Sequence, residues 1–478
     1  MVATATMSPI IRNQAKTTLV VGLGKSGLSI VRCLTRLGIS VAVADSRAHP
    51  PGLAELMRDF PQLPCYLGEF DPVLFAGAAQ IFISPGVPLN TPVIAAAVAR
   101  GTPVLGDIEL FARLVRAPVA AITGSNGKST VTTLLGLMAQ HAGIRVAVGG
   151  NLGTPALDLL ADTDPTSIVQ PAELYILELS SFQLETTHSL DAKVACVLNL
   201  SPDHLDRYLN YEAYVAAKKR IFQGQGVQIL NADDALVVAM AEPDRPQRWF
   251  TTNTPSQRQF GLLRQANKPC LGYGQEPWLA VNELSIRGMH NYANALAALA
   301  MGDALALPRQ AMLAALREFT GLPHRSQLVA EYAGVCWFDD SKGTNVGATV
   351  AAVQGMPGRV VLIAGGEGKE QDFSPLRTVL QDKTHALILL GRDRELIASS
   401  VANVVPYYFV DTMSEAVALA AQLAKPGDNV LLSPACASFD MFSNYEERGR
   451  VFNAAVKQLL AQQQNSGSLT AARQVTAC

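Results

Sequence analysis

The chain has 478 residues, of which 49% are hydrophobic and 16% are charged. It carries 38 Lys and Arg against 40 Asp and Glu, which gives a formal net charge of −2. The small charged share excludes an extended disordered chain, and the charge balance excludes a basic nucleic-acid-binding surface over the whole molecule. At roughly 150 residues per domain, the length indicates about three domains, each able to bury a core.

The seven cysteines are scattered, and no two lie close enough together for a zinc-ribbon spacing. This sparse, odd number is typical of a reducing compartment. The N-terminal segment lacks the pattern of a secretory signal, and no apolar run reaches the roughly 18 residues of a membrane span. We therefore expect a cytoplasmic protein with no membrane insertion and no nucleic-acid partner.

Short apolar segments alternate with helical patterns along almost the whole chain. The apolar segments show no polar alternation, which is typical of strands buried on both faces, and the helices between them predict parallel α/β sheets. The predicted strands are residues 18–22, 41–45, 81–84, 119–123, 174–178, 194–199, 360–365, 386–391 and 429–433. One boundary is expected near Gly106, just before a second strand and glycine-rich turn, and another near Gly321, after the Ala- and Leu-rich helices at 290–320. These boundaries predict domains at 1–106, 107–321 and 322–478.

The first glycine-rich turn, GLGKSG, spans residues 22–27 between a predicted strand and a predicted helix. Asp45 ends the next strand, 23 residues after Gly22. This context is typical of a dinucleotide-binding turn, in which glycines allow a tight bend and a helix N-terminus faces a phosphate. The alternative is a tight strand-to-helix turn without a ligand. Glycines alone do not distinguish NAD from another diphosphate.

The second glycine-rich turn, GSNGKST, spans residues 124–130 and follows the strand at 119–123. It ends like a P-loop, although Ile122 stands where the longer motif has its first glycine. Backbone N–H groups of such a loop cradle phosphate oxygens, Lys128 can reach the β- and γ-phosphates, and Ser129 can ligate Mg²⁺. The turn predicts a nucleoside triphosphate site.

Three further residues follow the second turn. Glu178 ends an apolar strand, where a metal ion would compensate its otherwise costly buried charge. His204 lies in a loop after the strand at 194–199. By spacing alone, it is more readily a hydrogen-bonded loop histidine than a metal ligand. By the same criterion, Lys218 is a solvated helix charge.

Eight motifs in fixed order make the chain resemble the Mur ligases from about Leu19 to Phe452. The motifs are GLGKSG, GSNGKST, ELSSFQLE, NLSPDHLDRY, GMHNYANALAALA, GLPHRSQ, DDSKGTN and SPACASFDMFSNYEERG. The resemblance implies three α/β domains. A Rossmann-like N-terminal domain would bind a uridine diphosphate rather than NAD, a central P-loop ATPase domain would bind ATP, and a Rossmann-like C-terminal domain would bring the amino acid.

The resemblance also assigns binding residues one by one. The positions that match the uridine-nucleotide substrate are Lys25, Ser26, Ser46, Arg47, Ser84, Gly86, Asn151 and Ser180. Those that match ATP are Gly124, Ser125, Asn126, Gly127, Lys128, Ser129, Thr130, Asn294, Arg325 and Asp340. Those that match D-glutamate are Lys342, Thr344, Lys369, Ser438 and Tyr445.

The resemblance implies Mg²⁺ at two sites, with Ser129, Glu178, His204 and Lys218 as ligands. Lys218 matches a carbamylated lysine of the family. Carbamylation replaces an ammonium with an anionic oxygen ligand, which explains a lysine beside Mg²⁺. The implied catalytic residues are Lys128, Glu178, His204 and Lys218.

The branch of the family is indicated by Lys342, which stands in DSK where other branches carry a different residue. Lys342 and Lys369 can offset the two carboxylates of glutamate. Tyr445 replaces a common phenylalanine, a conservative change. The resemblance thus implies a monomeric ATP-dependent ligase that adds D-glutamate to UDP-N-acetylmuramoyl-L-alanine through an acyl phosphate, releasing ADP and phosphate, in peptidoglycan precursor synthesis.

Three alternatives stay open at this stage. A related ligase could add another amino acid or extend folate, although folate enzymes lack the N-terminal GLGKSG domain. An NAD-dependent oxidoreductase built on residues 22–27 would leave residues 124–130 without a role. A non-catalytic nucleotide-binding or scaffold protein would not need Lys128, Glu178, His204 and Lys218 together.

Overall fold

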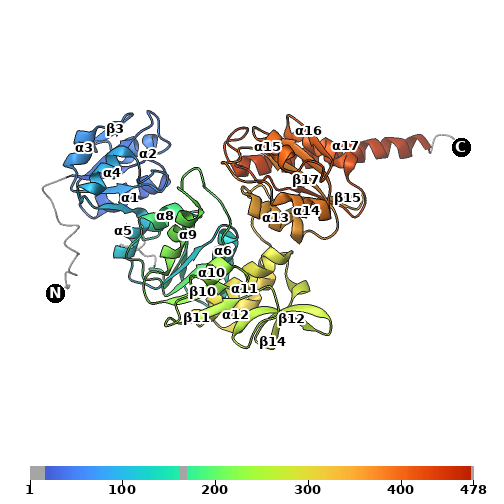
Figure 1. Ribbon diagram of the computed structural model, residues 1–478, viewed down its shortest axis with the longest axis horizontal. Coiled ribbons are helices and arrows are strands. Elements are labelled where there is room, and N and C mark those ends of the chain that lie inside the picture. Colours follow the sequence, from blue (N-terminus) through green and yellow to red (C-terminus); the bar gives the residue numbers. More distant parts are fainter. Residues whose placement is uncertain (1–16, 161–169, 475–478) are drawn as a thin grey trace.

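The computed structural model describes residues 17–160 and 170–474. It contains three sheets that follow one another along the chain. Figure 1 shows an N-terminal lobe and a C-terminal lobe on opposite sides of a central lobe, with the last helix extending away from the C-terminal lobe. The two glycine-rich turns therefore belong to different lobes.

The first sheet has the strand order β3-β2-β1-β4-β5, and every pair of neighbours is parallel. Its strands are short and almost fully buried where helices cover both faces, as expected of a doubly wound sheet. Its elements are β1 (Thr18–Val21), α1 (Lys25–Arg36), β2 (Val41–Asp45), α2 (Leu53–Asp59), β3 (Cys65–Leu67), α3 (Pro72–Gly77), β4 (Gln80–Ile83), α4 (Pro92–Ala99) and β5 (Val104–Gly106).

The second sheet has nine strands in the order β14-β13-β12-β11-β10-β9-β6-β8-β7. It is parallel from β7 to β12 and ends in an antiparallel meander, β12 to β14. Its strands are β6 (Val119–Thr123), β7 (Val146–Gly150), β8 (Leu174–Glu178), β9 (Val194–Val197), β10 (Val227–Asn231), β11 (Gln247–Phe250), β12 (Gln259–Gln265), β13 (Lys268–Tyr273) and β14 (Glu276–Ala280).

The helices of the central lobe connect and cover these strands. They are α5 (Asp107–Leu114), α6 (Lys128–His141), α7 (Ala156–Leu159), α8 (Ser181–Glu185), α9 (Tyr211–Lys219), α10 (Ala235–Val238), α11 (Met289–Ala304) and α12 (Arg309–Glu318), with short 3₁₀ turns at Arg220–Phe222 and Val281–Glu283. Helices α6, α11 and α12 pack on one face of the sheet and bury its apolar side chains.

The third sheet has the order β15-β16-β20-β17-β18-β19, parallel except for the β15–β16 hairpin. Two apolar clusters cover its two faces. Its elements are β15 (Gln327–Tyr332), β16 (Val335–Asp339), α13 (Val346–Gly355), β17 (Val360–Gly365), α14 (Leu376–Lys383), β18 (Thr384–Leu390), α15 (Arg394–Ser400), β19 (Tyr407–Phe409), α16 (Met413–Leu423), β20 (Asn429–Leu432) and α17 (Tyr445–Gln474).

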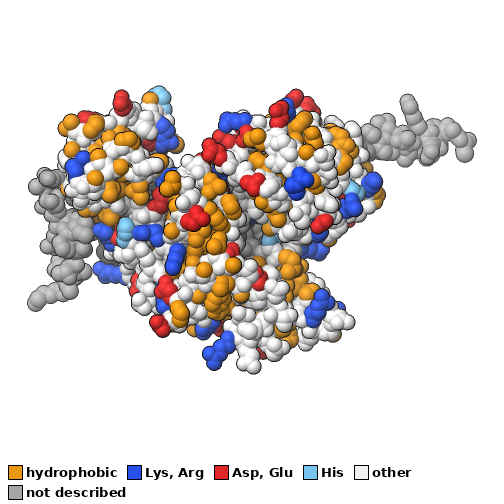
Figure 2. All heavy atoms as spheres, viewed as in Figure 1, with side chains coloured by type: hydrophobic (Ala, Val, Ile, Leu, Met, Phe, Trp, Pro, Cys, Tyr) orange, Lys and Arg blue, Asp and Glu red, His pale blue; other side chains and the backbone are white. Residues whose placement is uncertain are grey.

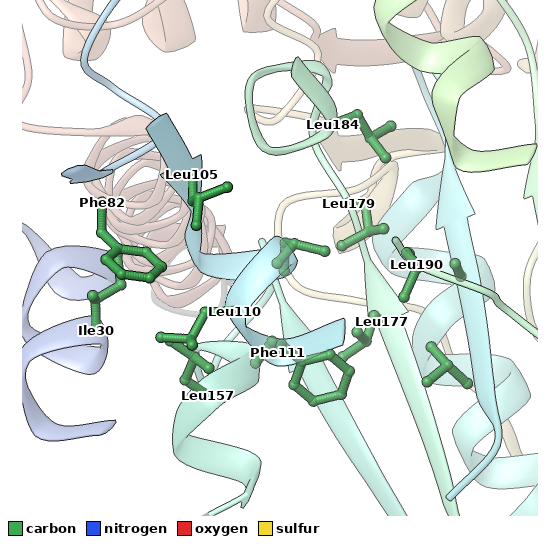
Figure 3. Close-up of a cluster of buried hydrophobic side chains, with 14 of the residues drawn as sticks. Ile30, Phe82, Leu105, Leu110, Phe111, Leu157, Leu177, Leu179, Leu184 and Leu190 are labelled. Carbon is green, nitrogen blue, oxygen red and sulfur yellow. The ribbon is translucent and has the colours of Figure 1, made fainter. Parts of the chain in front are cut away.

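The N-terminal and central lobes share one continuous core. Figure 3 shows Ile30, Phe82 and Leu105 of the first lobe beside Phe111 and Leu177 of the second, in a single cluster of buried side chains. The C-terminal lobe has its own clusters instead, and polar side chains make its hydrogen bonds to the central lobe. The first two lobes are therefore joined by apolar burial, whereas the third is held by hydrogen bonds and an ion pair.

The predicted α/β architecture is confirmed, because all nine predicted strands coincide with observed strands to within a residue or two. The sequence analysis did not predict the antiparallel meander β12 to β14, whose segments mix polar and apolar residues and have exposed ends. Among the residues that the structure describes, no helix is both long enough and apolar enough to cross a membrane.

Candidate functional site

The second glycine-rich turn forms a phosphate-type loop between β6 and α6. Gly124 and Gly127 adopt φ values of +150° and +82°, and a Cβ on Gly127 would lie 2.3 Å from Asn294 Oδ1. Only glycine fits there without strain. Lys128 begins α6, and its Nζ donates to the carbonyl oxygens of Gly124 and Ser125, both at 2.9 Å. The Lys128 side chain thus folds back over the loop, close to where a bound phosphate would lie.

Glu178 lies at the end of β8, beside the first turn of α6. Ser129 Oγ donates to Glu178 Oε2 at 2.5 Å, and Asn151 Nδ2 donates to Oε1 at 2.6 Å. Arg325 reaches across from the C-terminal lobe and donates to Ser129 Oγ at 2.7 Å. Burial alone would raise the pKa of Glu178, but the charge of Lys128 and these hydrogen bonds outweigh burial and hold the pKa below its usual value. The carboxylate is therefore ionised at neutral pH.

Lys218 is buried, contrary to its interpretation by spacing alone as a solvated charge. Its Nζ donates to Gly124 O at 2.8 Å and lies 4.8 Å from the ring centroid of Tyr214. Burial, and next the positive charge of Lys128, lower the pKa of Lys218 well below its ordinary value. The amine is neutral far more readily than a surface lysine, and a neutral amine is the nucleophilic form.

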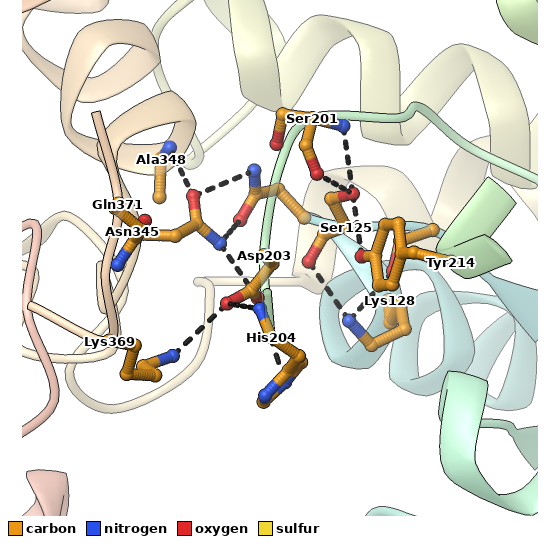
Figure 4. A network of polar contacts seen from close by, with 12 residues as sticks. Ser125, Lys128, Ser201, Asp203, His204, Tyr214, Asn345, Ala348, Lys369 and Gln371 are labelled. Carbon is orange, nitrogen blue, oxygen red and sulfur yellow. Dashed lines mark hydrogen bonds and ion pairs between the residues drawn. The ribbon is translucent and has the colours of Figure 1, made fainter. Parts of the chain in front are cut away.

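His204 and Asp203 follow β9 in a loop that faces the C-terminal lobe. His204 has a positive φ of 56°, and its ring lies 4.7 Å from that of Phe182. Burial lowers the pKa of His204, so the imidazole is neutral and able to act as a ligand. Asp203 pairs with Lys369 Nζ of the C-terminal lobe at 3.0 Å, as Figure 4 shows.

Three cavities meet around these residues. The nucleotide-side cavity, of about 290 Å³, lies between the central and C-terminal lobes and includes Asn126, Gly127, Thr130, Asn294, Arg325 and Asp340. The small polar cavity, of about 240 Å³, includes Lys128, Ser180, His204, Lys218 and Thr344. The N-terminal cleft, of about 1120 Å³, runs from the first glycine-rich turn to Ser129 and Glu178. Part of the hollow between the lobes is visible in Figure 2.

The N-terminal cleft brings together the residues predicted for the uridine-nucleotide substrate. Lys25, Ser26, Ser46, Arg47, Ser84, Gly86 and Asn151 all line it. Asp45 Oδ2 accepts a hydrogen bond from the Leu23 backbone N–H at 2.7 Å and pairs with Arg47, which fixes the turn relative to β2. Ser180 lines the small polar cavity instead, where it caps α8.

Lys342 lines all three cavities. Its Nζ lies 3.6 Å from the ring centroid of Tyr445, and burial lowers the pKa of Lys342 to about 8. Of the other residues predicted to bind the amino acid, Thr344 lines the small polar cavity and Lys369 is paired with Asp203. Ser438 is buried in the loop before α17 and lines none of the three cavities described above.

The side chains around the phosphate loop would complete a Mg²⁺ site only together with oxygen atoms of a bound phosphate. Within residues 17–160 and 170–474, no three His, Cys, Asp or Glu side chains lie together as a ready metal site. Glu178 and the Ser129 hydroxyl nevertheless lie side by side at the phosphate loop, the pairing of a carboxylate and a hydroxyl that Mg²⁺ takes up together with phosphate oxygens. His204 and Lys218 line one cavity, and burial lowers the pKa of both, which favours the neutral forms that carry a lone pair.

Sequence reasoning missed several residues of this site. Asn345 of the C-terminal lobe hydrogen-bonds to Asn126 of the phosphate loop and to Asp203 in the loop after β9. Asp107 of α5 accepts a hydrogen bond from Gln183 of α8 at 3.0 Å. Asp203 lies in the quoted motif NLSPDHLDRY and Asn345 in DDSKGTN, but no local spacing distinguishes them from ordinary loop polar residues.

Comparison with known proteins assigns each lobe to a family model. Residues 16–106 match "Mur ligase MurD-like, N-terminal domain", residues 122–302 match "Mur ligase middle domain", and residues 324–436 match "Mur ligase, glutamate ligase domain". The UDP-N-acetylmuramoylalanine--D-glutamate ligase of Nitrosococcus oceani is 53% identical over 95% of this chain and 99% of its own. The enzyme of the same name from Pseudomonas aeruginosa is 52% identical over 92% and 98%.

Solved structures show the same fold at low sequence identity. The UDP-N-acetylmuramate-alanine ligase of Thermotoga maritima superposes with a TM-score of 0.57 at 17% identity, covering 94% of this chain and 100% of that one. A pseudomurein peptide ligase type C from Methanothermus fervidus gives a TM-score of 0.56 at 19% identity, over 93% and 100%. The fold of this chain is therefore similar, over nearly its whole length, to that of these solved structures.

Proposed function

The chain belongs to the Mur ligase family, and from that premise we propose that it joins D-glutamate to UDP-N-acetylmuramoyl-L-alanine with hydrolysis of ATP to ADP and phosphate. Relatives more than half identical over nearly their whole length carry the name of this activity. The reaction makes a precursor of peptidoglycan. The family accounts for both glycine-rich turns, whereas an NAD-dependent oxidoreductase leaves the phosphate loop without a role.

The observation that carries the proposal is the position of Lys342 where the three cavities meet. A ligase must bring a nucleotide phosphate, the carboxylate to be activated and the incoming amine to one point. Here the nucleotide-side cavity supplies the phosphate, and the N-terminal cleft leads the sugar-linked carboxylate to Glu178 and Ser129. The third component arrives from the C-terminal lobe, which provides Lys342 itself.

Residues of the loop at 124–130 would hold the ATP phosphates through their backbone N–H groups, with Lys128 placed to neutralise the γ-phosphate. Lys128 would have to exchange its two loop carbonyl partners for phosphate oxygens. Arg325, which already reaches Ser129, would add a second positive charge from the C-terminal lobe. Asn294 and Asp340 line the same cavity, and by the family resemblance Asn294 would contact the adenine and Asp340 the ribose hydroxyls.

Mg²⁺ bound at two sites would neutralise the negative charge that builds up between the phosphates and the attacking carboxylate. Ser129 and Glu178 would hold one ion beside the phosphate loop, and His204 with Lys218 would hold the other in the small polar cavity. A carbamate on Lys218 supplies the anionic oxygen that an amine cannot. Its formation joins the neutral Nζ to the carbon of CO₂ with loss of one proton, and the low pKa of Lys218 favours the neutral form.

The chemistry proceeds in two steps. A carboxylate oxygen of UDP-N-acetylmuramoyl-L-alanine attacks the γ-phosphorus, the bond to the ADP oxygen breaks, and an acyl phosphate forms. The amine nitrogen of D-glutamate then attacks the acyl carbon, loses a proton, and phosphate leaves. Lys128 and Arg325 stabilise the charge on the transferred phosphoryl group. A metal-bound His204 has no free lone pair, so this assignment leaves it no role as the base.

Selection of glutamate would rest on Lys342 and Lys369, which offer one positive charge to each carboxylate. Lys369 would first release Asp203, its partner in this structure. Thr344 and Tyr445 lie close enough to complete the pocket, since they line the small polar cavity and the N-terminal cleft. Ser438 would join them only after movement of the loop that leads into α17.

The test is phosphate release from ATP and Mg²⁺ with UDP-N-acetylmuramoyl-L-alanine and each of D-Glu, L-Glu, L-Ala and L-Lys in turn. We expect release with D-Glu alone. Release with L-Ala or L-Lys would assign the chain to another branch of the family. NADH binding to the N-terminal cleft, with no phosphate release under any condition, would favour the oxidoreductase alternative.

Two further expectations belong to this proposal. We place the domain limits at 106/107 and 321/322, just beyond the ends of β5 and α12. We also propose that the protein acts as a monomer in the cytoplasm, because one chain contributes every residue assigned above to the three cavities. Light scattering of the purified enzyme at working concentration tests the first half of this statement.

A further inference from the structure

Two side chains of the C-terminal lobe hydrogen-bond to the phosphate loop within the described residues, Arg325 to Ser129 and Asn345 to Asn126. Arg325 has a role assigned above, whereas Asn345 has none. Asn345 precedes α13, and its Oδ1 accepts the backbone N–H of Ala348 at 2.8 Å, so that it caps the helix. The same side chain faces the central lobe. Its Nδ2 donates to Asn126 Oδ1 and to Asp203 Oδ2, both at 3.2 Å, and its Oδ1 lies 3.4 Å from Asn126 Nδ2.

The carboxylate of Asp203 accepts three hydrogen bonds, and its two oxygens have different donors. Oδ1 accepts from Lys369 Nζ and from the His204 backbone N–H, each at 3.0 Å, and Oδ2 accepts from Asn345. Figure 4 shows Asn345 and Lys369, both from the C-terminal lobe, converging on Asp203 of the central lobe. Asp203 is almost fully buried, so these hydrogen bonds are shielded from water.

Close packing around Asn345 restricts the relative position of α13 and the loop that carries Asp203. A Cβ on Gly347, in the first turn of α13, would lie 2.7 Å from Ser201 Oγ of the central lobe. The first turn of α13 is therefore pressed against the loop that carries Asp203. Among the described residues, the C-terminal lobe shares no apolar cluster with the central lobe. The spacing between the two walls of the nucleotide-side cavity therefore depends on these polar contacts together with the packing of α13 on α11.

We propose that Asn345 is a positioning residue that couples nucleotide binding to closure of the C-terminal lobe, by holding Asn126 of the phosphate loop and Asp203 at the same time. The proposal deepens the function proposed above and rests on it. Asn126 and Asn345 are already hydrogen-bonded in this structure, so a nucleotide that orders the phosphate loop holds Asn126 in place and stabilises this arrangement of the C-terminal lobe. The same arrangement keeps Lys342 beside the nucleotide-side cavity.

The donor and acceptor roles of Asn345 and Asp203 suggest a test in which the two side chains are exchanged, singly and together. In Asn345→Asp the cap on α13 is kept, since Asp and Asn are equally good at that position, but a carboxylate then faces Asp203. In Asp203→Asn the single carbonyl oxygen cannot serve both Lys369 and Asn345. In the double variant the contacts among positions 345, 203 and 369 are satisfied again, because the new amide at position 203 accepts from Lys369 through its oxygen and donates through its nitrogen to the carboxylate at position 345. Asn126 keeps the hydrogen bond from its own Nδ2 to position 345 and loses only the donor to its Oδ1.

The readout is ADP affinity, measured by calorimetry on the full chain without either acceptor substrate. We expect each single variant to weaken ADP binding at least about tenfold, and the double variant to lose clearly less than the product of the two single losses, since residues in one hydrogen-bond network are not additive. The double variant still binds ADP more weakly than the wild type, because Asn126 Oδ1 lacks its donor. Asn210→Asp, the same change at the exposed cap of α9, is the matched control and leaves ADP affinity unchanged.

Two results overturn the proposal. One is wild-type ADP affinity in Asn345→Asp, and the other is a double variant whose loss equals the product of the two single losses. Should Asn345→Asp fold poorly, Asn345→Ser is the second variant, because serine keeps a capping oxygen but is too short to reach Asp203. The proposal requires that Asn345→Ser weakens ADP binding, and that adding Asp203→Asn to it does not restore the affinity. Because ADP binding needs no acceptor, failure of D-glutamate to support turnover would reject the proposed function without touching this measurement.

Discussion

Asp340, which follows β16 directly, is a buried carboxyl that we expect to carry a proton in the nucleotide-free protein near neutral pH. Burial raises the pKa of Asp340 to about 7, although Ser433 and Ser326 donate to it. Ser433 Oγ lies 2.8 Å from Asp340 Oδ2 and 3.1 Å from Thr349 Oγ1, and it has one proton to give. A protonated Asp340 can donate to Ser433, which then donates to Thr349.

Replacing Asp340 with Asn imitates the protonated form, because the amide can donate where the carboxyl would. The wild-type carboxyl binds its proton more tightly in the folded chain, with a pKa of about 7, than in the unfolded chain, where the pKa is 3.8. Its contribution to stability is therefore complete below about pH 4 and is lost as the pH rises through 7. The gap between the two pKa values corresponds to about 4 kcal/mol of unfolding free energy.

Urea unfolding at pH 5, 6, 7 and 8 without nucleotide tests this expectation. Trp337, buried in the adjacent strand, reports on the C-terminal lobe once Trp249 and Trp278 are replaced by Phe. The unfolding free energy of Asp340→Asn, relative to the parent, should increase from pH 5 to pH 7 and level off toward pH 8, where the carboxyl is ionised in both states. Asp382→Asn, at an exposed carboxylate, is the control. A difference that stays constant within about 1 kcal/mol would show that Asp340 is ionised throughout, and the reasoning from burial would be wrong.

Three further changes have defined outcomes. Lys128→Ala should lower the rate of phosphate release at least about 10²-fold, the usual loss for one preorganised charge, and near-normal turnover would remove the phosphate-loop assignment. Lys218→Ala should have weak activity, which a small carboxylic acid restores in part and bicarbonate does not. Lys219→Ala, at the exposed neighbouring residue, should keep its activity. Full activity of Lys218→Ala would reject the carbamate. Phe111→Ala should cost about 3–5 kcal/mol in thermal or urea unfolding because it empties the core shared by two lobes, against almost nothing for the exposed Val73→Ala.

The sequence predicted those features that depend on neighbours along the chain. A strand buried on both faces needs only a run of apolar residues, so β1, β6 and β17 could be located from composition alone. The turn at Gly124 and Gly127 could be located because its two glycines take backbone conformations that other residues rarely adopt. The meander β12 to β14 escaped because its strands lie at the edge of the sheet and keep polar residues on their open side.

Contacts between distant parts of the chain left no such pattern. Asn126 and Asn345 are 219 residues apart, and Lys369 is 166 residues from Asp203. Each of these residues is an ordinary polar residue in its own segment. Only the packing of the third sheet beside the second brings them together, so the tie between the lobes could not be inferred from spacing.

Lys218 differs from these cases, because a local signal was present. Lys218 and Lys219 are adjacent, and on a helix they point about 100° apart, so at most one of them can face the core. Tyr214, Ala217 and Ile221 lie one to four residues from Lys218 and form the buried stripe of this segment. Lys218 lies within that stripe, whereas Lys219 is exposed. A lysine on an apolar stripe must have its charge removed or compensated. The pattern therefore indicates, independently of any resemblance, that Lys218 is not an ordinary solvated lysine.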